Sequence, residues 1–263
     1  MCARVAGLTT ALRDEGRRGD TQRAAGILAA MDGLIVALDG PGSSGKSSVG
    51  SAAAQAVGYR FCDTGLLYRA VTWLAELRGV PVDDPMGLVE LVDLVELAPD
   101  HRDRLAHVLV GGVDHTADVR GPAVDAAVSA VSAVPEVRAA LLERQRRLAE
   151  GGGIVMAGRD IGTVVLPDAD LKIYLDASVD ERARRRTEER GLSPGSDEAR
   201  DILDALRRRD RLDATRAVAP LRVAPDARII STDGNEFEDT VAAVVGAIRD
   251  AEARAGMAPS LGR

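Results

Sequence analysis

The stretch Leu34-Ile35-Val36-Ala37-Leu38-Asp39-Gly40-Pro41-Gly42-Ser43-Ser44-Gly45-Lys46-Ser47-Ser48 joins a short apolar run to a glycine-rich loop. An apolar strand, a loop with this glycine spacing and a following helix are the setting that a phosphate-binding loop requires. The glycines let successive backbone N–H groups turn toward phosphate oxygens, and the helix that begins near Lys46 adds its positive end. The stretch therefore predicts that Gly40 to Ser48 bind the phosphates of a nucleotide.

Two residues of this loop have a chemical role of their own. Lys46 is predicted to reach the β- and γ-phosphates, and the hydroxyl of Ser47 to bind Mg²⁺. The chain has 34 basic residues, of which only Lys46 and Lys172 are lysines, which leaves 32 arginines. A lysine in so arginine-rich a chain indicates a position that needs a compact ammonium rather than a planar guanidinium. A Gly/Ser-rich turn that matches by chance is the alternative, and the flanking strand and helix argue against it.

The composition bounds the class of protein. A chain of 263 residues suffices for one large α/β domain with inserted elements or for two small domains. No apolar run approaches the roughly 20 residues of a membrane span, so we expect no membrane partner. The two cysteines, Cys2 and Cys62, favour the reducing cytoplasm. A net charge of −7 and six aromatic residues disfavour nucleic acid as a partner.

The first 30 residues differ from the rest of the chain. They carry scattered arginines among small residues, and they lack the long apolar core and the Ala-x-Ala site of a secretory signal. We expect residues 1–30 to be a loose extension, or not to belong to the natural protein, which would then start at Met31. Residues 255–263 are expected to be a tail.

Between residues 31 and 254, short apolar segments alternate with helical patterns. Strands are predicted at 34–38, 59–62, 154–156, 171–176 and 228–230, with helices between them. This alternation predicts an α/β fold with a five-stranded parallel sheet covered by helices on both faces. Residues 82–119 are predicted to form a small inserted subdomain. They hold all three histidines, whose spacing favours surface roles over a metal site.

Arginines from separate segments are predicted to meet at one end of the sheet. Gly158-Arg159-Asp160 follows the strand at 154–156, at the edge where parallel α/β sheets bind ligands. Arg69 and Arg138 come from other helices, and further arginines cluster in 182–186 and 207–216. A phosphoryl-transfer site needs such convergent positive charge. For each arginine in 182–190, a solvated helix face with acidic partners is the alternative.

Several segments together resemble the bacterial cytidylate (CMP) kinases, a nucleoside monophosphate kinase branch of the P-loop kinases. The resemblance covers roughly residues 33–250 and rests on segments 39–48, 63–69, 128–145, 158–165 and 213–221. Any P-loop protein could show the first segment. The runs Gly-Arg-Asp-Ile-Gly-Thr-Val-Val at 158–165 and Arg-Ala-Val-Ala-Pro-Leu at 216–221 are far more discriminating.

This resemblance implies a P-loop kinase that transfers the γ-phosphoryl group of ATP to CMP or dCMP, with Mg²⁺, in pyrimidine nucleotide metabolism. It implies catalytic roles for Lys46, Arg159, Arg209 and Arg216. It implies that cytosine is read by Ser129, Arg138 and Asp160, that the acceptor phosphate is held by Arg69, Arg159 and Arg216 near Thr64, and that the ribose is bound by Arg209 and Asp213. The insert at 82–119 would extend the acceptor site, residues 187–212 would form a mobile helical lid, and a monomer is expected.

Ala157 departs from the family, which usually has an acidic residue immediately before Gly-Arg-Asp. A carboxylate there is placed to act on Mg²⁺ or its water shell. Asp39 and Asp63 are the acids that could compensate. Because of this departure, one alternative function stays open: a nucleotide-binding sensor or a degenerate kinase with weak turnover. A kinase for another small acceptor and a nucleic-acid motor are the remaining alternatives.

Overall fold

The computed structural model describes residues 33–257, so the predictions for residues 1–30, for Met31 and for the end of the tail lie outside the described residues. The strands are β1 (Ile35–Asp39), β2 (Arg60–Asp63), β3 (Val95–Pro99), β4 (Arg104–Val110), β5 (Val113–Asp114), β6 (Ile154–Gly158), β7 (Leu171–Asp176) and β8 (Arg228–Ser231). The α-helices are α2 (Lys46–Val57), α3 (Gly65–Arg78), α4 (Pro85–Val92), α5 (Pro122–Val131), α6 (Pro135–Ala149), α7 (Val179–Glu189), α8 (Asp197–Thr215) and α9 (Phe237–Arg254). The predicted alternation of strands and helices is confirmed.

One sheet organises the chain, in the order β3-β4-β2-β6-β1-β7-β8 with β5 paired to β4. The five predicted strands β2, β6, β1, β7 and β8 lie next to one another in this order and pair in parallel. The predicted count of five is too low, because the segment 82–119 adds three strands and the described sheet has eight. In that segment β4 pairs in parallel with β2 and antiparallel with β3. The added strands satisfy the backbone groups of β2 that an open edge would leave unpaired.

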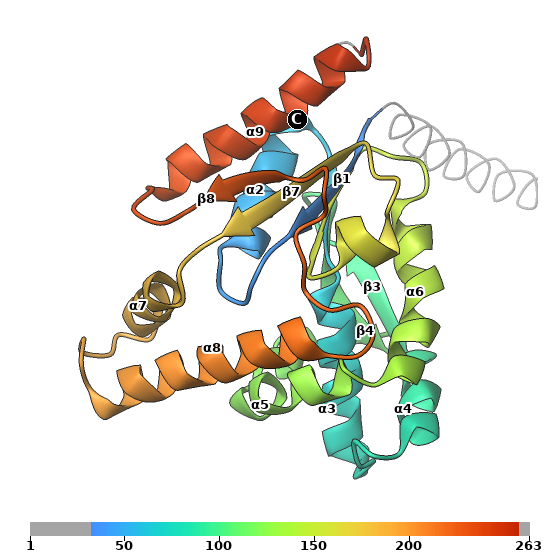
Figure 1. Cartoon of the computed structure of the whole chain (residues 1–263). Coiled ribbons are helices and arrows are strands. Elements are labelled where there is room, and N and C mark those ends of the chain that lie inside the picture. The colour runs from blue at the N-terminus through green and yellow to red at the C-terminus, as the bar shows by residue number, and fades with distance from the viewer. Residues whose placement is uncertain (1–32, 258–263) are drawn as a thin grey trace, which may run out of the picture.

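Helices cover both faces of the sheet (Figure 1). On one face, α3, α4, α5 and α6 contribute Leu74, Leu88, Val128 and Leu141 to the larger apolar core. On the other face, α2 and α9 pack side chains such as Val49 and Ile248 against Leu38 of β1. Burial on both faces explains why β1 and β6 are almost wholly apolar rather than alternating.

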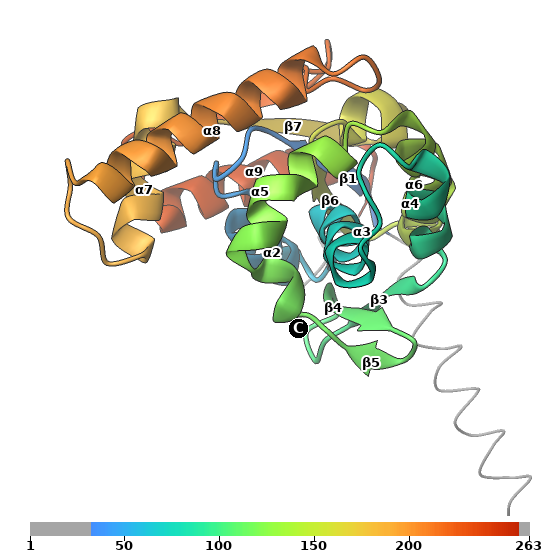
Figure 2. The ribbon, with the colours of Figure 1, turned by 90° about the horizontal axis from the view of Figure 1, so that it is seen from below.

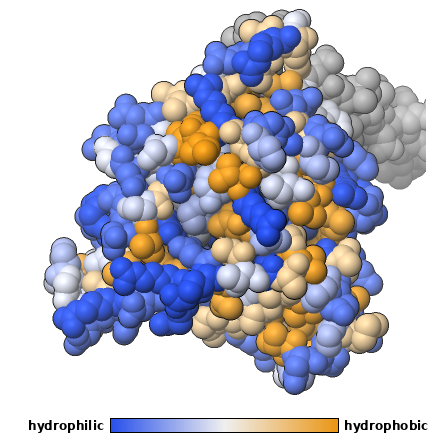
Figure 3. All heavy atoms as spheres, viewed as in Figure 1, coloured by the Kyte–Doolittle hydropathy of each residue, from blue (hydrophilic) through white to orange (hydrophobic). Residues whose placement is uncertain are grey.

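The helices α7 and α8 stand apart from these layers (Figures 1 and 2). They pack on each other through a small apolar cluster of Ala183, Ile202 and Leu206. Figure 3 shows that the surface along α8 is strongly hydrophilic on the face turned to the viewer. Across residues 33–257, no helix is long and apolar enough to cross a membrane.

Candidate functional site

The phosphate loop runs from the end of β1 to the start of α2. Gly40 has φ +154°, and a Cβ on it would lie 2.2 Å from the carbonyl oxygen of Leu175. Gly45 precedes the helix with φ +88°, a left-handed conformation that glycine adopts without strain. The helix then begins at Lys46, so its free N–H groups face the loop. The backbone therefore has the form that an anion-binding loop requires.

Lys46 is folded back into this loop. Its Nζ donates to the carbonyl oxygen of Pro41 at 2.6 Å and to Ser44 Oγ at 3.3 Å. Burial lowers the pKa of Lys46 well below its usual value, and the nearby Arg159 lowers it further. Negatively charged phosphates would counter both effects and favour the charged ammonium.

A cavity of about 720 Å³ opens beside the loop, between β2, β6, α3, α5 and the α7–α8 pair. Nine arginines line it: Arg69, Arg120, Arg138, Arg159, Arg184, Arg185, Arg186, Arg209 and Arg216. Six acids line it: Asp63, Asp160, Glu188, Glu189, Asp213 and Glu236. The excess of guanidinium groups suits a ligand with several negative charges.

Most of the residues predicted from the sequence meet in this cavity. Those lining it are Ser43, Ser44, Gly45, Lys46, Ser47, Ser48, Thr64, Arg69, Arg138, Arg159, Asp160, Arg209, Asp213 and Arg216. The predicted Gly40, Pro41 and Gly42 do not line it and form the part of the loop next to β1. Ser129 is buried within α5, and Ser132, three residues further on, lines the cavity in its place.

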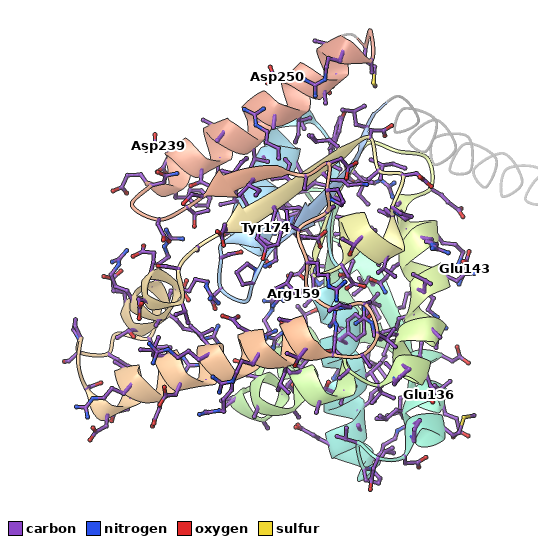
Figure 4. All side chains as sticks on the ribbon, viewed as in Figure 1. Glu136, Glu143, Arg159, Tyr174, Asp239 and Asp250 are labelled. Carbon is purple, nitrogen blue, oxygen red and sulfur yellow. The ribbon has the colours of Figure 1, made fainter. Side chains whose placement is uncertain are left out.

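Arg159 and Arg209 form the positive centre of the cavity. Figure 4 shows Arg159 between β7 and α8, whereas the labelled acids of α6 and α9 point outward. Arg159 Nε donates to Asp213 Oδ2 at 2.9 Å. Arg209 Nε is buried and has no hydrogen-bond partner among the described residues. Burial, followed by the charge of Arg159, lowers the pKa of Arg209 to about 10. A guanidinium whose buried Nε has no partner, lying beside a second guanidinium, indicates a site for an anion.

Asp160 lies between two buried arginines. Arg138 Nη2 donates to Asp160 Oδ2, and Arg216 Nη2 donates to Asp160 Oδ1 at 3.1 Å. Arg216 Nε also donates to the carbonyl oxygen of Ala219 at 2.6 Å. The guanidinium of Arg138 lies 5.3 Å from the centre of the Tyr68 ring, at cation–π distance. These contacts hold donors and an acceptor in fixed positions at one end of the cavity.

Asp125 is a residue that the sequence analysis missed. Its carboxylate accepts from Arg69 Nη2 and from Arg186 Nη2, each at 2.6 Å. Burial raises the pKa of Asp125, but the hydrogen bond from Arg69 and the charges of Arg69 and Arg186 outweigh burial and lower it. Asp125 thus links α3, through Arg69, to α7, through Arg186. The partners are 56 and 61 residues away, and no local pattern signals such a contact.

Arg182 belongs to the arginine cluster 182–186 of the sequence analysis, but its partners were not predicted. Its Nη1 donates to the carbonyl oxygen of Gly42 at 2.9 Å, and both terminal nitrogens bind Asp210 of α8. The solvated-face alternative is therefore wrong for Arg182, which joins the phosphate loop to both α7 and α8. That alternative holds for Arg184, whose exposed side chain binds Glu181 and Glu188 of its own helix.

The two acids proposed to compensate for Ala157 lie in different settings. Asp39 accepts from the backbone N–H groups of Ile161 at 2.8 Å and Gly162 at 2.7 Å, and burial raises its pKa to about 6. Asp63 accepts from Ser47 Oγ at 2.6 Å and from the N–H of Gly65 at 3.0 Å. Among the described residues no cluster of three His, Cys, Asp or Glu could hold a metal by itself. Mg²⁺ on a nucleotide needs only one or two carboxylates besides phosphates and water. Asp63 offers such a carboxylate, and Ser47 offers a hydroxyl oxygen beside it.

Comparison with known proteins gives a consistent result. A family model described as cytidylate kinase matches residues 36–250. A cytidylate kinase of Mycobacterium leprae (strain Br4923) is 48% identical over 204 residues, 77% of this chain and 89% of the relative. A cytidylate kinase of Geobacillus kaustophilus (strain HTA426) is 46% identical over 210 residues, 79% of this chain and 93% of the relative. The family match thus spans the phosphate loop, the strands of the sheet and the helices α7 and α8.

Proposed function

The chain belongs to the cytidylate kinase family, and from this premise we propose that it transfers the γ-phosphoryl group of ATP to the 5′-phosphate of CMP or dCMP. The observation that carries the proposal is the cavity itself. The phosphate loop and Asp160, with its two arginine partners, both line this cavity. Arg159 and Arg209 line it as well. This arrangement suits two nucleotides whose phosphates meet.

The loop would hold the donor. Backbone N–H groups of Gly40 to Ser48 and the start of α2 would bind the β- and γ-phosphates, with Lys46 at their charged oxygens. When bound, Mg²⁺ would neutralise part of the charge on these phosphates, and Ser47 with a nearby carboxylate would hold it. Arg185 binds the hydroxyl and carbonyl of Thr232, which holds α7 beside the loop after β8.

Asp160 and its neighbours would hold the acceptor base. Its carboxylate can accept from the exocyclic amine of cytosine, and Arg138 can donate to the ring carbonyl and N3. Uracil presents a carbonyl where cytosine has the amine, so it would leave Asp160 facing another acceptor. A site built to pair with a donor discriminates strongly against a ligand that lacks it.

The arginines between the two ends would carry the chemistry. An oxygen of the acceptor phosphate attacks the γ-phosphorus while the bond to the β-phosphate oxygen breaks, and ADP leaves. Arg69, Arg159 and Arg216 would hold the acceptor phosphate near Thr64, and Arg209 would stabilise charge on the transferred group. Closure of α7 and α8 would exclude water, which would otherwise accept the phosphoryl group.

The proposal extends to the ribose, to the domains and to the setting. Arg209 and Asp213 would bind the ribose, residues 82–119 would extend the acceptor region, and 187–212 would move as the lid. We propose a cytoplasmic location, supported by the need for ATP and by the scarcity of cysteines, and a monomer as the default state. The alternative of a degenerate kinase gains no support, because the matched relatives are named as kinases over the same segments.

The test is an ADP-release assay with ATP and Mg²⁺, in which CMP, dCMP, UMP, AMP and GMP are offered in parallel. Rapid release with CMP and dCMP alone, abolished in Lys46→Ala, is the expected result. Asp160→Asn should narrow the gap between CMP and UMP, because its amide can donate to the uracil carbonyl. ATP binding without release for any acceptor would refute the proposed transfer.

A further inference from the structure

We propose that Asp63 supplies the carboxylate that holds Mg²⁺, or its water shell, at the phosphate loop, in place of the acid that position 157 lacks. The inference rests on the proposed function, since the Mg²⁺ concerned is the one that accompanies ATP. It assigns to β2 a role that P-loop proteins usually give to the strand carrying the Walker-B acid.

The register of two strands places Asp63 beside Ala157. β2 and β6 pair in parallel with Asp63 opposite Ala157, and residues paired in this way point to the same face of the sheet. Ala157 is 1% exposed and belongs to the apolar core formed with Leu38 and Val49. Asp63 reaches Ser47 at the start of α2 on that same face. A carboxylate at position 63 therefore lies on the same side of the sheet, next to the phosphate loop, as a carboxylate at position 157 would.

Four of the other acids near the loop are engaged elsewhere. Both oxygens of Asp39 accept backbone N–H groups, so this buried carboxylate holds the turn after β6. Asp160 is bound to two arginines, Asp213 to Arg159, and Glu188 to Arg184. Of the six acids that line the cavity, Asp63 is the one bonded to a residue of the phosphate loop.

The contact between Asp63 and Ser47 also suits the chemistry of the ion. The Ser47 hydroxyl donates a hydrogen bond to Asp63 Oδ2, which leaves the lone pairs of Oγ available to a cation. Mg²⁺ prefers oxygen ligands and retains several waters, so a carboxylate 2.6 Å from the liganding hydroxyl can bind either the ion or one of its waters. The remaining oxygen, Oδ1, accepts a hydrogen bond from the N–H of Gly65, which fixes the orientation of the carboxylate.

The decisive experiment measures ATP binding by calorimetry in EDTA and over a series of free Mg²⁺ concentrations. The wild type is expected to bind ATP more tightly with Mg²⁺. Asp63→Asn keeps the shape and an acceptor for Gly65, and it should need at least about tenfold more Mg²⁺ for the same gain while its binding in EDTA is unchanged. Glu143→Gln, which neutralises an exposed acid of α6 that points away from the cavity (Figure 4), is the control and should follow the wild type.

Two further variants keep the result interpretable. Asp63→Glu retains the charge and should stay closer to the wild type than Asp63→Asn, with thermal melting used to compare folding. In the double variant Asp63→Asn, Ala157→Asp, the Mg²⁺ concentration needed for the gain in ATP affinity should fall part of the way back to the wild-type value. Unchanged Mg²⁺ dependence in Asp63→Asn, or equal defects in the Asn and Glu variants, would overturn the assignment of Asp63 and leave the kinase proposal standing. A wild type that bound no ATP would instead refute the proposed function.

Discussion

Replacing Asp160 by alanine should destabilise the whole domain, because it removes the shared partner of two buried cations. Asp160, Arg138 and Arg216 are only 5%, 7% and 9% exposed. Loss of one partner of a buried ion pair costs about 3–5 kcal/mol, since the remaining charge stays buried without compensation. In a domain of this size, 1 kcal/mol lowers the melting temperature by roughly 2–4 °C. We therefore expect Asp160→Ala to melt about 6–20 °C below the wild type.

The assay is scanning calorimetry at pH 7 with Glu143→Ala as the control. Glu143 is exposed on α6 and points outward (Figure 4), so its loss should change stability by less than about 0.5 kcal/mol. Sulfate should restore part of the stability of Asp160→Ala, because a small anion can lie between the two guanidinium groups. A variant that melts within about 1 °C of the wild type would refute the view that this carboxylate stabilises the fold through Arg138 and Arg216.

Three other changes test separate parts of the site. Lys46→Arg keeps the charge but not the compact ammonium, so turnover should fall at least about 100-fold, a loss typical of a misplaced donor; near-normal turnover would contradict the argument. Asp125→Ala frees Arg69 and Arg186, so amide exchange in α7 should become several-fold faster without nucleotide, and equal exchange rates would show that Asp125 does not hold α7. The pKa of Asp39 is raised from 3.8 to about 6, so the stability it contributes is complete below pH about 4 and is lost as pH rises through 6. Relative to Asp39→Asn, the wild type should lose up to about 3 kcal/mol between pH 4 and 7 in thermal unfolding, and a constant difference would contradict this.

The boundaries of several elements could be predicted because single residues determine them. Pro122 and Pro135 fix the first turns of α5 and α6, and both helices begin at those prolines. Gly58 and Gly79, with φ +75° and +67°, end α2 and α3 in the left-handed conformation. The strands of 82–119 were missed because β4 lies toward the edge of the sheet and is only partly buried, and the two residues of β5 are exposed. Neither strand has the continuous apolar run seen in β6.

The site was predictable where a motif is local and was missed where the partners are distant. Arg182 and Arg184 lie two residues apart in one arginine-rich helix, yet only Arg182 contacts the loop and is buried, whereas Arg184 is exposed and binds acids of its own helix. Which side of α7 faces inward depends on how it packs against α8 and the end of β7, and charge spacing does not encode that. Asp63 was considered only as a possible substitute for a missing acid, since its contact with Ser47 requires β2 and α2 to be in place.

The strand order also determines when β1 can pair with its neighbours during translation. β1 lies between β6 and β7, so both of its neighbours are made later in translation. From Ile35 to Ile154 the ribosome adds 119 residues (154 − 35), which takes roughly 6–24 s at bacterial or eukaryotic rates. During this interval the backbone of β1 lacks its two sheet partners. The phosphate loop packs at Gly40 against Leu175 of β7. The nascent chain can therefore complete this loop, and be stabilised by ATP, only after β7 has been synthesised.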